Sequence, residues 1–415
     1  MDNDPSTLQH FSPWGKTIST PDQIYSVGGT QQLAQAMLTR FGAVTNEQCP
    51  YSTGSMAGVD QVIAPTGLLH DMLGSFASGN IYGYIKDNLA YYKGLIKSYG
   101  ALSMAMNPDW NRISENMTEI YNDTATTTSH AMAIVGWDDA YEFQHFTDAQ
   151  GNTLKGAWIV RNSYGTEINN GDRIIKVGDN GYHYMSYQDT SAQNGVVQIP
   201  ELDSARYTQL NSVAKIYLPE LFFSSKNSCS FASKLTSSAS QMVKAVGFYA
   251  SNDDMSYNIS VRLKGSAPQE GTEVYAQSGT FGKDGLAPYK GYRTVDLNKF
   301  LYLPDKENYV ITVTLTDKNG DTVYAWASQD GTWCIPDRPV ADNMTFVSVD
   351  GQWVDAKAYS TPYGFTNAAM ILNGLAKNSE QANGGDFTVV SLNDNGAGGS
   401  ERNSSLPLIV PSSST

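Results

Sequence analysis

The chain has 415 residues, of which 40% are hydrophobic and 16% are charged, so it is long enough for two folded domains. Its 27 Lys and Arg residues stand against 41 Asp and Glu residues, which gives a formal net charge of −14. This acidic balance argues against partners that need a basic surface, and we therefore expect neither nucleic acid nor an anionic membrane as a partner.

The sequence has no apolar run of about 18 residues, so we expect no membrane-spanning segment. Its first eleven residues lack the apolar stretch of a signal peptide, which on its own would favour the cytoplasm. We interpret the amino terminus as truncated, for reasons given below, and a surface rich in Ser, Thr, Asn and Gln fits a secreted or cell-surface protein.

The first half of the sequence predicts helices followed by strands. Residues 1–22 are polar, contain three prolines and are expected to be an irregular segment. A helix is predicted over residues 30–42, with an apolar face, and a second helix is predicted from Ile85 to Tyr99, ended by Gly100. Strands are predicted over residues 101–106, 130–137, 156–162 and 181–187. Residues 23–203 are therefore expected to form a mixed α+β domain with an antiparallel sheet.

After about residue 204 the helical periodicity disappears. Residues 257–264 alternate between apolar and polar side chains, as a strand with one buried face does. Residues 310–315 and 322–326 flank Asn319-Gly320 and predict a β-hairpin. Residues 204–375 are expected to form an all-β sandwich, and residues 376–415, rich in Ser, Asn and Gly, a flexible tail.

One group of residues has the pattern of a catalytic site. His130 opens an apolar strand, Asn162 begins an Asn-Ser-Tyr-Gly sequence about thirty residues later, and residues 178–182 read Gly-Asp-Asn-Gly-Tyr. An imidazole can take the proton of a cysteine to give a nucleophilic thiolate. A carboxamide oxygen on the neighbouring strand can accept from the other ring nitrogen and orient the imidazole.

This pattern resembles the papain-like (C1-type) cysteine peptidases, where a histidine at the head of an apolar strand is followed by an Asn-Ser-Trp-Gly box. The resemblance implies that His130 is the catalytic base and acid and that Asn162 orients it. Tyr164 stands where the family has Trp and is expected to cover the pair. The fold implied is an α+β papain-like peptidase domain, incomplete at its N-terminus, followed by the all-β sandwich domain.

The resemblance also implies substrate-binding residues and a second domain. Gly28 and Gly29 look like the Gly-Gly segment that pairs with the extended peptide substrate, and Ser129 is expected to line a subsite. Residues 246–249 and 278–281 are similar to the lectin-like domain that follows the peptidase domain in a bacterial subgroup.

The nucleophile of the family is missing from this sequence. In the family it lies in a Gln-x-x-x-x-x-Cys-Trp motif several tens of residues before the Gly-Gly, whereas only 27 residues precede Gly28 here and none is Cys. We therefore expect a chain that is inactive as given, through truncation or natural loss. Cys49, Cys229 and Cys334 are either ordinary thiols or one disulfide with a spare cysteine, and their spacing excludes a zinc pattern.

Two functions remain open. The first is cysteine-type peptidase activity on a peptide or protein substrate. The alternative is a pseudo-peptidase that binds a glycan or a cell surface through its lectin-like domain. No cofactor is implied, and no metal site is expected, because His10, His70 and His145 have no second partner at metal-ligand spacing.

Two weaker patterns each have two interpretations. Residues 317–321 resemble a calcium loop, but the glycine is misplaced, which favours a hairpin turn. Trp326, Trp333 and Trp353 could form a platform on which sugars stack or could belong to the core of the sandwich, and the core is the favoured interpretation.

Overall fold

The computed structural model describes the parts of the chain named at the end of this paragraph, and every structural statement below concerns them. The chain divides into two compact units, one formed by Met72–Pro200 and the other by Met1–Asp71 together with Glu201–Thr415. The described residues are 10–11, 17–18, 71–74, 85–109, 117–124, 128–169, 171, 174–199, 207, 209–214, 220–283, 290–330, 340–359, 366–378, 387–390 and 401–404.

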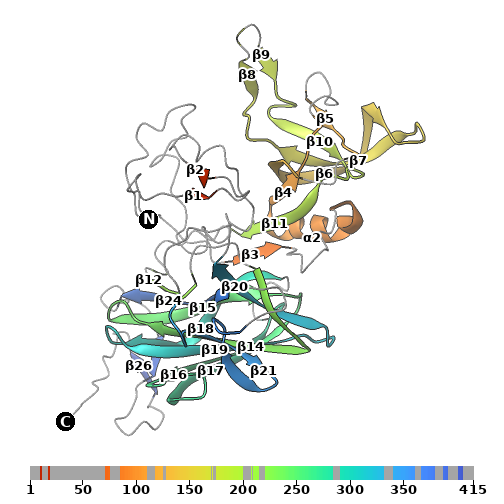
Figure 1. Ribbon diagram of the computed structural model, residues 1–415. Coiled ribbons are helices and arrows are strands. Elements are labelled where there is room, and N and C mark those ends of the chain that lie inside the picture. The colour runs from red at the N-terminus through yellow and green to blue at the C-terminus, as the bar shows by residue number, and fades with distance from the viewer. Residues whose placement is uncertain are drawn as a thin grey trace, which may run out of the picture. The chain divides into compact units, whose positions relative to one another are not determined.

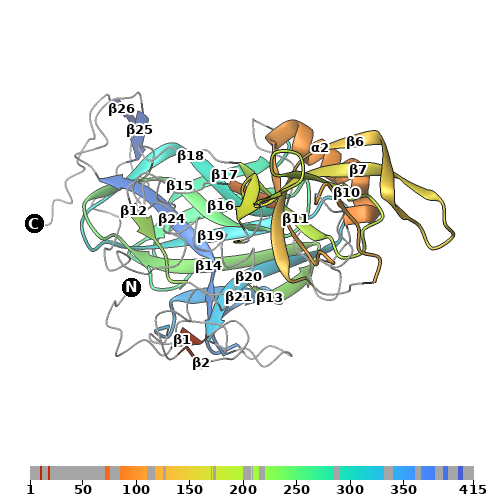
Figure 2. The same ribbon diagram turned by 90° about the horizontal axis from the view of Figure 1, so that it is seen from above.

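The unit formed by Met72–Pro200 contains the described helical elements, the 3-10 helix η2 (Ile85–Asn88) and the helix α2 (Leu89–Tyr99) (Figure 1). The helix α2 ends at Gly100, whose φ of 91° is costly for other residues and whose N–H donates to the Ile96 carbonyl. Its buried residues Tyr92, Leu95 and Ile96 give it one apolar face, and it lies against strands β6 and β11 of the sheet, as Figure 2 shows.

The sheet of this unit has the order β11-β4-β6-β7-β10-β5. Neighbouring strands are antiparallel, except that β10 and β5 are parallel. A separate antiparallel pair, β8 with β9, follows β7 in the chain. The strands are β4 (Leu102–Met106), β5 (Glu119–Ile120), β6 (His130–Thr147), β7 (Thr153–Arg161), β8 (Glu167–Asn169), β9 (Ile174–Lys176), β10 (Tyr182–Ser186) and β11 (Gln193–Ile199).

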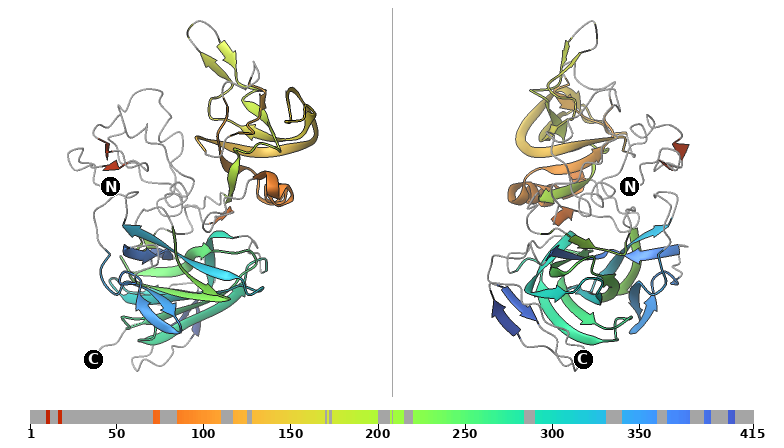
Figure 3. Two further views of the ribbon diagram at one scale, coloured as in Figure 1. Left: turned by 45° about the vertical axis from the view of Figure 1, so that its right-hand side comes forward. Right: turned by 90° about the vertical axis from the view of Figure 1, so that its left-hand side faces the viewer.

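The second unit is built from layered sheets, which Figure 3 shows from two sides. One set of strands pairs in the order β12-β24-β15-β18, a second in the order β17-β16-β19-β14-β21-β22, and a third in the order β13-β20-β23. The first set consists of β12 (Gln209–Asn211), β24 (Leu372–Asn378), β15 (Gln241–Ala250) and β18 (Gly291–Leu303). The second consists of β17 (Thr272–Thr280), β16 (Ser256–Leu263), β19 (Asn308–Thr316), β14 (Ser228–Thr236), β21 (Thr345–Val349) and β22 (Gln352–Asp355). The third consists of β13 (Glu220–Lys226), β20 (Thr322–Asp330) and β23 (Thr366–Met370).

Five short strands complete the list. β1 (His10–Phe11) pairs with β2 (Thr17–Ile18). β25 (Phe387–Val390) pairs with β18 and with β26 (Glu401–Ser404). β3 (Asp71–Gly74) contains the point in the sequence at which one unit ends and the other begins.

The core of the layered unit lies between its sheets. Phe248 of β15 packs against Phe231 of β14 and against Phe281, with ring centroids 6.4 and 6.2 Å apart. All three rings are at most 1% exposed, and burying each such side chain contributes about 1.5–3 kcal/mol. The predicted alternation of residues 257–264 is confirmed, since Tyr257, Ile259, Val261 and Leu263 are buried in this core.

The expected α+β papain-like domain is wrong. Strands dominate the described residues of both units. The helix α2 has only 11 residues, and together with the short 3-10 helix η2 it is too little to form the helical layer of an α+β domain. The strands β6 and β7 run on as a long ribbon, with β6 alone covering 18 residues. The helix predicted over residues 30–42 lies outside the described residues.

The hairpin predicted around Asn319-Gly320 is also wrong. Strand β19 pairs with β14 and β16, whereas β20 pairs with β13 and β23, so the turn carries the chain from one sheet to another. The Asp317 carboxylate accepts from the backbone N–H groups of Asn319 and Asp321 at 2.8 and 3.1 Å. This side chain therefore stabilises the reversal without any pairing between the flanking strands.

Candidate functional site

His130 and Asn162 lie at the same end of two paired strands. His130 is the first residue of β6, and Asn162 directly follows the last residue of β7. The pairing of Ile134 with Val160 places residues 130, 132 and 134 on the same face as residues 160 and 162, because alternate residues of a strand share a face. The register of the sheet thus brings the imidazole and the carboxamide together.

The contact between these two side chains is a hydrogen bond. His130 Nε2 lies 3.0 Å from Asn162 Oδ1, and the same oxygen accepts from the backbone N–H of Ser163 at 2.8 Å. Because Oδ1 can only accept, the imidazole must carry a proton on Nε2 in this contact. The Asn162 side chain is buried, at 3% exposure, so the orientation of the ring is held from inside the protein.

Tyr164, an exposed residue, contacts the imidazole of His130. The ring centroids of His130 and Tyr164 are 5.4 Å apart, with the ring planes inclined at 36°. Tyr164 is 40% exposed, and its partial burial raises the pKa of its hydroxyl. The aromatic ring therefore covers His130 only in part.

The residues expected to bind substrate are only partly described. Ser129 precedes His130, and its hydroxyl donates to the Asn107 side-chain oxygen at 2.8 Å, while its N–H donates to the Met106 carbonyl. These bonds anchor the start of β6 against the end of β4. Gly28 and Gly29 lie outside the described residues, so their placement near His130 stays a prediction.

The described cysteine is unsuited to nucleophilic chemistry. Cys229 lies on β14 in the core of the layered unit, is 1% exposed, and burial raises its pKa to about 12. A thiol with this pKa is almost fully protonated near neutrality and is a poor nucleophile. Cys49 and Cys334 lie outside the described residues. In the parts of the chain that the structure describes, no three His, Cys, Asp or Glu residues gather as metal ligands.

His183 shares the sheet face of the His130–Asn162 pair. It lies on β10, is fully buried, and its Nδ1 donates to the Met117 carbonyl. Burial, above all, lowers its pKa, so its neutral form is favoured. The sequence predicted a strand over residues 181–187, but nothing in it linked His183 to Asn162.

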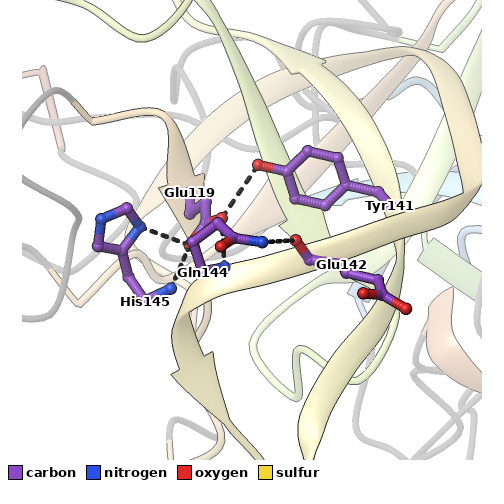
Figure 4. Close-up of polar contacts among 5 residues, drawn as sticks. All are labelled: Glu119, Tyr141, Glu142, Gln144 and His145. Atoms are coloured by element: carbon purple, nitrogen blue, oxygen red, sulfur yellow. Dashed lines mark hydrogen bonds and ion pairs between the residues drawn. The ribbon is translucent and has the colours of Figure 1, made fainter.

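A second polar cluster surrounds the buried carboxylate of Glu119 on β5 (Figure 4). One carboxylate oxygen accepts from the Tyr141 hydroxyl at 3.0 Å and from the backbone N–H of Gln144 at 2.8 Å. The other lies 2.9 Å from both the backbone nitrogen and Nδ1 of His145. Glu119 therefore ties the β6–β7 ribbon to the parallel edge of the sheet, which is a structural role.

The structure describes two of the three tryptophans that were expected in the sandwich core, with a sugar platform as the alternative. Trp326 of β20 is 6% exposed and stacks on Tyr249, with centroids 5.1 Å apart, so it belongs to the packed interior. Trp353 of β22 is half-buried and packs against a smaller apolar cluster of Ala232, Val310 and Phe346. Trp333 lies outside the described residues.

Comparison with known proteins identifies the layered unit. Residues 220–370 match the family model described as the lectin-like domain. The chain carries a lectin-like domain. The match spans β13 to β23, which are the strands that enclose the Phe231–Phe248–Phe281 core. No curated protein matches the chain.

Two solved structures of clostridial cysteine proteases are similar to this chain in fold. The first is the cysteine protease and lectin-like domains of Cwp84, a surface-layer-associated protein of Clostridium difficile, with 20% identity and a TM-score of 0.62. The alignment covers 83% of this chain and 72% of that chain. The second is a clostridial Cwp84 variant after propeptide cleavage, with 19% identity, a TM-score of 0.61, and 85% and 83% of the two chains covered. At these identities the likeness concerns the fold.

No helix among the described residues is long and apolar enough to cross a membrane.

Proposed function

We propose that this chain is a surface protein that binds a glycan through its lectin-like domain and that its His130–Asn162 pair performs no peptidase chemistry. The observation that carries the proposal is the match of residues 220–370 to the lectin-like domain, whose strands form one continuous core. The similar Cwp84 protein is described as associated with the surface layer, which supports a secreted or cell-surface location for this chain.

The charge of the chain indicates how such binding would work. A net charge of −14 repels anionic cell-wall polymers, so attraction must come from hydrogen bonds and apolar contacts with a neutral glycan. Exposed charges are screened by salt, whereas these short-range contacts are not. We therefore expect binding to persist in about 0.5 M salt, where the Debye length is only about 4 Å.

Peptidase activity is the second candidate, and one observation favours it. The imidazole of His130 and the carboxamide of Asn162 lie 3.0 Å apart, in the arrangement that orients a general base. Such a pair needs a thiolate within reach. Cys229, the described cysteine, is buried in the lectin-like core and kept protonated by its raised pKa.

The test uses the full chain in two parallel assays. Binding is measured by co-sedimentation with purified bacterial cell walls and on an array of neutral glycans, with release by free sugar as the specificity check. Hydrolysis is measured with a panel of fluorogenic peptides and denatured casein. The matched variant is His130→Ala, which leaves the lectin-like domain unchanged.

The proposed function requires sugar-releasable binding that is equal in the parent chain and in His130→Ala, with no hydrolysis by either. Hydrolysis that a thiol reagent blocks and His130→Ala abolishes would establish the second candidate instead. Absence of any sugar-releasable binding contradicts the glycan-binding proposal, whatever the hydrolysis assay shows.

A further inference from the structure

Two buried polar atoms near the His130–Asn162 contact have no hydrogen-bond partner among the described residues. They are Asn162 Nδ2 and His183 Nε2, on side chains that are 3% and 0% exposed. Buried polar groups in folded proteins are nearly always paired, with protein or with an ordered water, because an unpaired one loses its hydration without compensation. Each of these two atoms is therefore expected to have a hydrogen-bonding partner such as an ordered water.

The sheet register places the two side chains on one face as diagonal neighbours. His183 of β10 pairs directly with Val160 of β7, and Asn162 lies two positions beyond Val160. The pairing continues to Asn162, whose N–H donates to the Gly181 carbonyl. Diagonal neighbours on adjacent antiparallel strands have Cα atoms about 7–8 Å apart, a separation that their side chains and one small molecule can span.

The two atoms are chemically complementary. Asn162 Oδ1 already accepts from His130 and Ser163, so the opposite end of the carboxamide, Nδ2, is a donor. His183 Nδ1 donates to the Met117 carbonyl, which leaves Nε2 of the neutral ring as an acceptor. A water accepts from the first and donates to the second, and two such partners are within the usual range for a buried water.

We propose that His183 is a positioning residue for the His130–Asn162 pair, acting through one buried water that accepts from Asn162 Nδ2 and donates to His183 Nε2. This bridge holds the carboxamide from its nitrogen end, while His130 and Ser163 hold it from its oxygen end. A carboxamide turned over would set its NH₂ group against two other donors. The bridge therefore fixes which atom faces the imidazole.

The test is nuclear magnetic resonance on the full chain labelled with ¹⁵N. The chain has 5 histidines, so each ring can be assigned by single substitution. In the parent chain we expect the Asn162 Nδ2 protons to show a transfer of magnetisation from water and slow exchange. The His183 Nε2 signal should be displaced in the direction of a hydrogen-bonded acceptor.

Two substitutions separate the hydrogen bond from packing. His183→Phe fills the space without an acceptor and should speed exchange of the His130 Nε2 and Asn162 Nδ2 protons about tenfold, as loss of one hydrogen bond would. His183→Gln offers an acceptor oxygen and should retain slow exchange. His145→Gln, on the far part of β6, is the matched control and should change neither signal.

The proposal is overturned if His183→Phe leaves both exchange rates unchanged, or if His183→Gln speeds them as much as His183→Phe does, since packing alone would then explain the effect. Absence of water transfer to Asn162 Nδ2 in the parent chain also overturns it. That measurement needs no variant, so it decides the matter even if His183→Phe fails to fold.

Discussion

Tyr164 lies against His130 with ring centroids 5.4 Å apart, and Tyr164 itself is 40% exposed. We predict that Tyr164→Ala makes His130 several-fold more reactive toward diethylpyrocarbonate, because the variant removes the ring that covers it. Tyr164→Phe keeps the ring and should react at the rate of the parent chain. Mass spectrometry of the modified peptide measures both rates. Equal rates in all three chains would show that Tyr164 does not shield the imidazole.

Glu119 supports the second prediction. Glu119→Gln replaces one acceptor oxygen by an NH₂ group, which then faces donors from the ribbon, either those of His145 or those of Tyr141 and Gln144. Unpaired and opposed donors in a buried site cost about 1–3 kcal/mol each, so we expect the free energy of unfolding to fall by about 2–4 kcal/mol. Urea denaturation followed by circular dichroism measures the change.

Glu142 is the matched control for Glu119, because it lies on the same ribbon (Figure 4) and its side chain is exposed. Its ion pair with Lys155 joins two exposed side chains, and such pairs contribute about 0–1 kcal/mol. Glu142→Gln should therefore change the free energy of unfolding by less than about 1 kcal/mol. If both substitutions lowered the free energy of unfolding by similar amounts, the buried hydrogen bonds of Glu119 would not contribute more to stability than an exposed ion pair.

Local features of this chain could be predicted from its sequence, whereas their assembly could not. The alternation of residues 257–264 predicted β16, because a strand with one buried face has a period of two. The Asn-Gly turn after residue 318 marked a reversal but carried no information on which sheet receives the next strand. Strand β20 pairs with β13, about a hundred residues earlier in the chain, and no short-range signal encodes that choice.

In the candidate site, too, the local features could be predicted from the sequence, whereas the surrounding fold could not. The spacing of His130 and Asn162 predicted an imidazole and a carboxamide on neighbouring strands, and the register of β6 and β7 brings them to 3.0 Å. Their catalytic role stays a prediction. The fold class inferred from the same motif was wrong, because a few residues at a strand end do not determine the layers around them. His183 was missed as a partner, because its relation to Asn162 depends on the register of β10.

Cys229 yields a prediction about chemical reactivity. The thiol is 1% exposed and its pKa is raised to about 12 by burial, so at about pH 8 the thiolate fraction is about 10⁻⁴. In a Cys49→Ala, Cys334→Ala background we expect no reaction with Ellman's reagent under native conditions and one equivalent of reacted thiol in denaturant. Rapid labelling of the native variant would place Cys229 outside the core.

His183 predicts a dependence of stability on pH. Burial lowers its pKa in the folded chain, while the unfolded chain has the ordinary value of about 6.5. Below about pH 6.5 the unfolded state therefore binds a proton that the folded state does not. The free energy of unfolding falls by up to about 1.4 kcal/mol per pH unit until the folded pKa is reached.

The matched chain for this measurement is His183→Gln, which cannot bind that proton. Urea midpoints of both chains at about pH 7.5 and about pH 5.5 bracket the unfolded pKa. We expect the parent chain to lose more stability on acidification than His183→Gln does. Parallel losses in the two chains would show that His183 titrates normally in the folded protein.

The core of the lectin-like domain gives the last prediction. Phe248 is fully buried between Phe231 and Phe281, so Phe248→Ala leaves a cavity that costs about 3–5 kcal/mol. A domain is stable by only about 5–15 kcal/mol, and this loss therefore raises the unfolded fraction by about a hundred-fold to several thousand-fold. Limited proteolysis of the full chain should give a resistant fragment that spans residues 220–370 in the parent and loses it in Phe248→Ala. Asn258→Ala, on the exposed face of β16, is the control and should keep the fragment.

Because the proposed glycan binding needs this domain folded, Phe248→Ala should lose binding to cell walls together with the fragment. Binding that survives loss of the fragment would place the glycan site outside the lectin-like domain.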